Sequence, residues 1–325
     1  MSGRRESTEF KRNTMQPTMN ERAWRIADEL EANATSLRVG ISRVAGTRVI
    51  DCGGAETGSL GAGVLLARAC LADLATVQLV PGEFGPTICV QTDEPVRACL
   101  GSQYAGWQVK VDRFFAMGSG PFRALAAREE LFQHISAKET SAYAVGILES
   151  RKHPTEDVVA HLVSKLPEDV EHLTLLVAPA SCIAGTIQVV ARSVETALHK
   201  LHELKFDMNH VLSAFGSAPM PPVSSEELTA IGRTNDAILY GSRVTLWVRC
   251  DDELIDAIGP RVPSSASADH GSLFAELFAR YGDFYKIDPM LFSPAEVTFV
   301  NLKTGRAKTF GSTAPELLKR SFFGE

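Results

Sequence analysis

Two neighbouring stretches, Ser102-Gln103-Tyr104-Ala105-Gly106-Trp107 and Phe114-Phe115-Ala116-Met117-Gly118-Ser119-Gly120-Pro121, carry the most information in this sequence. The first places an amide, a phenol and an indole close together, and such a set can stack on a flat ring and hydrogen-bond to its edge. The second is a glycine–serine turn that leads into a helix, since proline is well suited to the first helical turn. Tyrosine and tryptophan are more often buried packing residues, so core packing and ligand binding both stay open here.

Outward from these stretches, strand-like and helix-like runs alternate, which predicts a mixed α/β or α+β fold. Asn20 is a candidate cap for the first predicted helix, and Thr304-Gly305 is a candidate hairpin turn. The predicted strands are two runs within 37–51 and the runs 87–92, 141–148 and 173–177; the predicted helices are 19–34, 121–135, 156–166 and 186–204.

A faint internal echo suggests two lobes. The runs SLGAGVLLARACLADL and CIAGTIQVVARSVETAL each follow a strand and place small residues before a helix. Two similar lobes that face a cleft would fit this echo. We therefore expect a flexible tail over residues 1–18 and one catalytic unit of two lobes over residues 19–325, with an internal boundary near residues 150–172.

Composition sets the broad class. The chain has 325 residues, of which 45% are hydrophobic, and a formal net charge of −6. That length supports a large core, and the acidic balance argues against a nucleic-acid partner. No window is apolar enough to predict a membrane span or a secretory leader, so a cytoplasmic protein is expected. The six cysteines form no C-x-x-C pair, which favours reduced thiols over disulfides or a zinc site.

Arg192 and Glu195 are the first candidates for chemistry. They lie three residues apart in the predicted helix 186–204, off its apolar stripe. A solvated ion pair is the commoner reason for such spacing. The functional alternative is a general base whose charge and orientation are set by a guanidinium. The helix follows a strand and a loop of small residues, a position where α/β folds bind ligands.

Three other segments have weaker signals. The run CGGAETGSLGAG (52–63) fits neither the dinucleotide fingerprint nor the P-loop, so a tight turn is favoured over phosphate binding. The run 232–241 gathers donors and acceptors into what reads as one short loop, either a ligand wall or a capped turn. The run 283–289 is either a surface loop or a further ligand contact. No histidines cluster with metal-ligand spacing, so no metal is expected.

Taken in order, these motifs resemble the methenyltetrahydromethanopterin cyclohydrolases from about residue 20 to the C-terminus. The motifs that carry the resemblance are DCGG with the following GAG, SQYAGW, FFAMGSGP, the segment from Ala178 to Glu195, GRTNDAILYG and DFYKIDPMLFSPA. Tyr104 departs from some archaeal members, which have a basic residue near this point. The charge balance is more similar to that of a bacterial member that works in formaldehyde oxidation.

The resemblance implies a compact homotrimer in which each subunit has a substrate cleft between two α/β-type lobes. It implies hydrolysis of the cationic methenyl bridge of a tetrahydropterin carrier to a formyl group, without a metal or redox cofactor. Glu195 would then be the general base and Arg192 the group that orients it. The implied substrate-binding residues are Gln103, Tyr104, Gly118, Ser119, Asn235, Asp236, Tyr285 and Lys286.

Two alternatives remain beside this reading. The same chemistry on a folate carrier, or on the dephosphorylated form of methanopterin, involves nearly the same reacting centre. A pterin-binding trimer without activity is the alternative outside enzymes, and the presence of both Arg192 and Glu195 argues against it.

Overall fold

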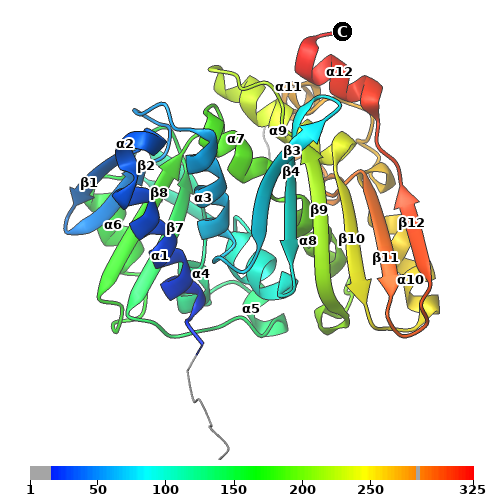
Figure 1. Cartoon of the computed structure of the whole chain (residues 1–325), viewed down its shortest axis with the longest axis horizontal. Helices are drawn as coiled ribbons and strands as arrows, with labels where there is room; N and C mark the ends of the chain where they lie inside the picture. The colour runs from blue at the N-terminus through cyan, green and yellow to red at the C-terminus, as the bar shows by residue number, and fades with distance from the viewer. Residues whose placement is uncertain (1–15, 283–285) are drawn as a thin grey trace, which may run out of the picture.

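Two six-stranded sheets stand side by side in the computed structural model of the chain, which describes residues 16–282 and 286–325 (Figure 1). We call the sheets A and B. This mixture of sheets and covering helices confirms the predicted fold class. No helix in the described ranges is both long and apolar enough to cross a bilayer.

Sheet A has helices on both faces. Its strands, in spatial order, are β1 (Gly40–Val44), β2 (Thr47–Asp51), β8 (His172–Ala178), β7 (Tyr143–Glu149), β6 (Phe114–Ser119) and β5 (Trp107–Val111). The central strands β2, β8 and β7 run parallel. Strands β7 and β8 are almost continuously apolar because both of their faces are buried. Helices α1 (Met19–Ala32) and α3 (Leu60–Cys70) pack on one face, and α6 (Glu156–Val163) packs on the other.

Sheet B is covered on one face. Its strands, in spatial order, are β12 (Ala307–Gly311), β11 (Glu296–Asn301), β10 (Arg243–Val248), β9 (Val211–Pro219), β4 (Gly85–Thr92) and β3 (Thr76–Gly82). Buried and less buried residues alternate along β10 and β11, as expected when only one face meets the core. Helices α8 (Ser193–Glu203) and α9 (Glu227–Gly241) pack against this sheet, and the face toward the viewer in Figure 1 carries no helix.

Shorter elements connect or flank the two sheets. They are α2 (Ala34–Leu37), the π-helix η1 (Val96–Gln103), α4 (Phe122–Ala126), α5 (Leu131–His134), α7 (Ile183–Val190), α10 (Asp252–Ile258), α11 (Phe274–Tyr281) and α12 (Pro315–Phe323). The helix predicted over 121–135 is therefore two short helices. The hairpin predicted at Thr304-Gly305 is confirmed, because β11 and β12 pair antiparallel on either side of it.

The internal echo corresponds to two parallel strand–helix units. Strands β2 and β8 are neighbours, and the helices that follow them, α3 and α7, pack against each other. Ser59 and Cys182 cap these helices through hydrogen bonds from a main-chain N–H three residues later. Gly63 lies where α3 meets α7, and an added Cβ there would come within 3.0 Å of the Cα of Ala184.

The chain passes between the sheets more than once. It builds β1 and β2 of sheet A, then β3 and β4 of sheet B, then β5 to β8 of sheet A, and finally β9 to β12 of sheet B. Residues 150–172 lie between two neighbouring strands of sheet A, so the boundary predicted there does not separate the two sheets. Residues 1–15 of the predicted tail lie outside the described ranges, and Thr18 belongs to the first helix as its cap.

Three further predictions need correction. Thr18 caps α1 in a capping box with Glu21, whereas Asn20 is buried and its side chain bonds to Glu139 and to the carbonyl of Pro121. Residues 232–241 form the second half of helix α9 and not a short loop. The long helix predicted over 186–204 is broken after Val190, and α8 begins at Ser193.

Candidate active site

The break between α7 and α8 lies where the chain passes from sheet A to sheet B. Helix α7 packs against α3 on sheet A, whereas α8 packs against β9 and β10 of sheet B. At the break, the ψ angles of Ala191 and Arg192 are 1° and 7°, so neither residue continues a regular helix. Arg192 occupies the N-cap position of α8, and its carbonyl accepts the first hydrogen bond of that helix, from Thr196. Arg192 therefore lies at the junction of the two sheets.

The side chain of Arg192 ties three distant segments together. The guanidinium is buried, and its Nη1 donates to the main-chain carbonyl of Gln103 at 2.6 Å. Its Nη2 donates to the Ser119 hydroxyl at 3.2 Å and lies 3.9 Å from the Cys70 sulfur. These partners come from η1, β6 and α3, so the guanidinium is held in one orientation.

Glu195 lies beside this guanidinium on the first turn of α8. Its carboxylate is 3.7 Å from Nη1 of Arg192, and the residue is only 5% exposed. The commoner reading of the sequence, a solvated ion pair, is therefore wrong because both residues are buried. Burial raises the pKa of Glu195, while the positive charges of Arg192, His199 and Arg123 act to lower it. A carboxyl with a raised pKa is a suitable proton acceptor near neutral pH.

Gln103 completes the contact between η1 and the helix break. Gln103 is the last residue of the π-helix η1. The main-chain N–H of Tyr104, which follows it, donates to the carbonyl of Cys99 and closes the last turn of that helix. The Gln103 amide donates to the carbonyl of Ala191 at 3.1 Å. Its Oε1 is buried and accepts no hydrogen bond from the described part of the chain. The amide oxygen is therefore an acceptor near Arg192 that a water or a substrate can use.

Tyr104 forms an aromatic surface next to Glu195. Its ring stacks on His199 with centroids 4.8 Å apart, and the guanidinium of Arg123 lies 5.1 Å from its centroid. Arg123 is fully buried and pairs with Glu129. Burial, assisted by the charge of Glu195, raises the pKa of Tyr104 to about 12, so its hydroxyl stays protonated at neutral pH.

Gly118 and Ser119 are the last two residues of strand β6, shortly before α4 begins. An added Cβ on Gly118 would lie 3.1 Å from the Cβ of Trp107, its neighbour across the strand pair. The Ser119 hydroxyl lies 3.3 Å from the Cys70 sulfur, in addition to its bond with Arg192. The stretches 102–107 and 114–121 thus meet around the guanidinium of Arg192, as their proximity in sequence suggested.

The remaining predicted site residues are not brought to this pair by the contacts described. Asn235 bonds to the carbonyl of Ile231 on its own helix. Asp236 accepts hydrogen bonds from Ser321 and from the main chain of Phe274, and burial raises its pKa to about 6. Lys286 is exposed, and Tyr285 lies outside the described residues. Their roles as substrate contacts stay predictions.

Two residues near Arg192 were missed by sequence reasoning. Cys70 lies among Arg192, Ser119 and Gln188, whose amide donates to its sulfur at 3.3 Å. Glu149 is the last residue of β7, and the positive charge of Arg192 acts to lower the pKa of its carboxyl group. The available signal for Glu149 was a charged residue that directly ends an apolar strand, which is also common at ordinary strand ends.

The glycine-rich loop after β2 already holds an anion of its own. The carboxylate of Asp51 accepts hydrogen bonds from the main-chain N–H groups of residues 53–56. Burial acts to raise the pKa of Asp51, but these four donors outweigh it and lower the pKa. Because the donors that could cradle a phosphate are engaged, the loop is a tight turn, as favoured from the sequence.

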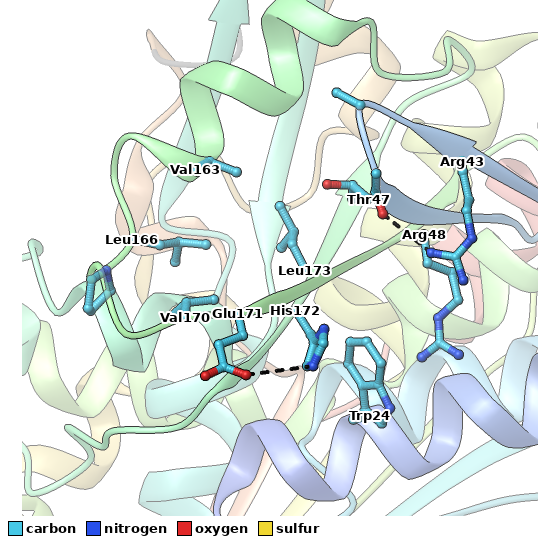
Figure 2. A pocket seen from close by; sticks show the side chains of 13 residues that line it. Trp24, Arg43, Thr47, Arg48, Val163, Leu166, Val170, Glu171, His172 and Leu173 are labelled. Atoms are coloured by element: carbon cyan, nitrogen blue, oxygen red, sulfur yellow. Dashed lines mark hydrogen bonds and ion pairs between the residues drawn. The ribbon is translucent and has the colours of Figure 1, made fainter.

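A cavity of about 590 Å³ lies elsewhere (Figure 2). It opens at the N-terminal ends of β2 and β8, where Trp24, Arg48 and His172 line it. Arg48 stacks over Trp24 and pairs with Asp28 and Glu31. None of its lining residues is a partner of Arg192 or Glu195, so the cavity is separate from the candidate active site.

Known proteins match nearly the whole length of this chain. The family model described as Cyclohydrolase (MCH) matches residues 18–322. A protein of Rhodopirellula baltica is 47% identical over 321 residues, which cover 96% of each chain. A protein of Methylobacterium sp. is 42% identical over 95% of this chain and 98% of its own, and one of Methanosarcina barkeri is 37% identical over 94% and 98%. All three carry the name methenyltetrahydromethanopterin cyclohydrolase.

Proposed function

The chain belongs to the methenyltetrahydromethanopterin cyclohydrolase family, and from this we infer that it is an enzyme of one-carbon metabolism that converts methenyltetrahydromethanopterin to formyltetrahydromethanopterin by reversible hydrolysis. The observation that carries the mechanism is the buried pair of Arg192 and Glu195 at the junction of the two sheets.

The substrate carbon needs little activation. It is the central carbon of an amidinium, whose positive charge is shared by two nitrogens, so a positioned water can attack it directly. The C–O bond forms as Glu195 accepts one proton from the water. One C–N bond then breaks, and its nitrogen takes a proton that Glu195 delivers. The second proton of the water is released to solvent, which balances the loss of the positive charge.

Arg192 orients the base and sets its proton affinity. Its bonds to Gln103 and Ser119 fix the guanidinium, which then fixes the position of the Glu195 carboxylate. Its positive charge opposes the rise in the Glu195 pKa that burial causes, which favours the ionised form that acts as the base. A carboxylate also stabilises the bound cation, and it accelerates the reaction only by interacting more strongly with the transition state.

Gln103 and Tyr104 are proposed as the first substrate contacts. The buried Oε1 of Gln103 is an acceptor for the attacking water or for a ring N–H. The half-buried Tyr104 ring is proposed as an aromatic contact, and Gly118 and Ser119 of β6 are proposed as contacts on the strength of the family resemblance. Asn235, Asp236, Tyr285 and Lys286 are proposed as more distant contacts on the strength of the family resemblance.

We propose that the reaction needs neither a metal nor a redox cofactor, because the carbon is already electrophilic and no electrons are transferred. Activity in the presence of a strong chelator tests this. We also propose a homotrimer, on the strength of the family resemblance. Light scattering of the purified protein measures the oligomeric mass directly, and a monomeric mass at working concentration would contradict the trimer.

The direct test is the ultraviolet absorbance of the methenyl group. Purified protein is mixed with methenyltetrahydromethanopterin and, in parallel, with methenyltetrahydrofolate. Rapid loss of the methenyl band with the methanopterin alone supports both the reaction and the carrier. Loss with the folate alone keeps the chemistry and changes the carrier, and no loss with either leaves a pterin-binding protein without activity. The direction of flux, proposed here as formaldehyde oxidation in a bacterium, is tested by growth of a deletion strain on methanol.

A further inference from the structure

Glu149 occupies a position at which α/β proteins commonly bind ligands. It is the last residue of β7, paired with Met117 of β6 and with Ala178, the last residue of β8. Ligands bind outside the C-terminal ends of parallel strands such as these two. The next segment also reaches the other half of the molecule, since Arg151 donates to Ser181 and to the carbonyl of Ser225, just before α9.

The side chain of Glu149 lies on the face of sheet A that carries Arg192. Alternate residues of a strand share a face. Ile147, two residues earlier, packs into the core formed with α1, α3 and α7, whereas Leu148 packs into the core on the opposite face. Ser119, which pairs with Ile147, also lies on this face and accepts a hydrogen bond from Arg192. Glu149 and Ser119 are therefore diagonal neighbours on the Arg192 side of the sheet.

Glu149 differs from the other part-buried or buried carboxylates described above in having no donor. Asp51 accepts four main-chain N–H bonds, Asp236 accepts two hydrogen bonds, and Glu195 contacts Arg192. Within the described ranges, the side chain of Glu149 has neither a hydrogen bond nor an ion pair, although the residue is part-buried and within electrostatic reach of Arg192 and Glu227. Burial raises its pKa, as expected for a carboxyl that lacks donors.

The oxygens of the Glu149 carboxylate are not fully buried, so a ligand can reach them and bring donors to a carboxylate that has none among the described residues. The pyrimidine end of a pterin presents a ring N–H and an amino group side by side, and a carboxylate can accept both in parallel. The amidinium carbon lies at the other end of the fused rings. Because the charge of Arg192 acts on both carboxylates, Glu149 and Glu195 belong to one site, and one end of the substrate can meet Glu149 while the other meets Glu195.

We propose that Glu149 is a substrate-binding residue that accepts hydrogen bonds from the N–H edge of the pterin ring. The proposal rests on the proposed function, because it names the ligand of the same site. Glu149 then sets the direction in which the substrate enters, and it contacts the methenyl and formyl forms equally, since the edge does not change in the reaction.

The variant Glu149→Gln tests this role, with Glu171→Gln as the control because the Glu171 side chain is 72% exposed. Dissociation constants are measured by calorimetry for the cationic methenyl form and for two neutral ligands, the formyl form and the unsubstituted tetrahydropterin. We expect Glu149→Gln to weaken all three about 10- to 100-fold, the range for loss of a charged hydrogen-bond partner. At saturation, kcat should change little, and the control should match the wild type.

Other results would overturn the proposal. Weaker binding of the cationic form alone would make Glu149 a counterion to the amidinium. A fall in kcat with unchanged affinities would make it a proton-transfer group, and unchanged affinities with unchanged kcat would leave it a structural residue. The urea midpoint of the variant should equal or exceed that of the wild type, because an unpaired charge is removed. Absence of turnover in the wild type would instead contradict the proposed function.

Discussion

The guanidinium of Arg192 donates to the main-chain carbonyl of Gln103 across 2.6 Å, which joins the break between α7 and α8 to the end of the π-helix η1. The Gln103 side chain returns the contact by donating to the carbonyl of Ala191 at 3.1 Å. This reciprocal pair of bonds holds the helix break against the end of the π-helix. These bonds also position Glu195, because Arg192 is its ion-pair partner at 3.7 Å.

Replacing Glu195 with glutamine should remove the base and keep the shape of the site. We expect kcat to fall about 100- to 10,000-fold, the usual range for loss of a general base, with smaller changes in affinity for the formyl product. Stopped-flow absorbance of the methenyl band measures the rate. Glu203→Gln on the same helix is the control, because its side chain is 46% exposed. Near-normal turnover by Glu195→Gln would assign proton transfer to another group.

Replacing Arg192 with glutamine should shift the pH dependence of activity. Burial raises the pKa of Glu195 and the Arg192 charge opposes this rise, so loss of the charge raises the pKa further. A base works only when ionised, and the rate therefore falls as pH drops through that pKa. We expect the acid limb of the kcat profile to move to higher pH in Arg192→Gln, and to move less in Arg192→Lys.

An arginine outside the site provides the comparison for this pH profile. Arg97 pairs with Glu94 and its side chain is 35% exposed. Arg97→Gln should keep the wild-type acid limb. If the acid limb of the kcat profile of Arg192→Gln also lies at the wild-type pH, the group that titrates in this limb is not Glu195.

Replacing Gly63 with alanine should loosen the contact between α3 and α7. The added methyl group would lie 2.7 Å from Cδ1 of Ile187 and 3.0 Å from the Cα of Ala184, so the helices must separate. Overpacking of this kind costs about 1–3 kcal/mol in free energy of unfolding, which urea denaturation measures. Gly232→Ala is the opposite control, because the nearest atoms are 3.8 Å away and alanine favours a helix by about 0.5–1 kcal/mol.

Replacing Asp51 with asparagine should destabilise the turn between β2 and α3 by about 1–3 kcal/mol at neutral pH, since main-chain donors lose their anionic acceptor. The folded protein lowers the pKa of Asp51, so its contribution is present above the usual value of 3.8 and is lost as pH falls through the lowered pKa. The stability gap between variant and wild type should therefore narrow in acid. A constant gap from pH 7 to pH 3 would contradict this account.

The elements of the fold that depend on local pattern were predictable. The runs 141–148 and 173–177 became β7 and β8 because continuous apolar stretches of that length suit strands buried on both faces. The pairing of β2 with β8, 126 residues apart at Arg48 and Thr174, was suggested only by the echo between the helices that follow them.

The helix break could not be predicted. Residues 186–204 contain no glycine or proline, and their apolar stripe continues without interruption. The break arises because α7 packs on α3 whereas α8 packs on sheet B, and this arrangement involves strands far away in sequence. The burial of Arg192 and Glu195 follows from the same arrangement, since η1 and β6 cover them. The three-residue spacing in the sequence predicted that Arg192 and Glu195 lie close together, but it did not predict that both are buried.

The same interleaving of the two sheets has a consequence for synthesis of the chain on the ribosome. Strands β1 and β2 emerge early, but their partner β8 is not available until residue 178 has left the exit tunnel. In the meantime β3 and β4, emerging next, await β9 of sheet B. Neither sheet can close its core before the residues of α7 and α8 are made. Sheet A therefore waits for β8 and α7, and sheet B waits for β9, so the segment that carries Arg192 and Glu195 is made between these two events.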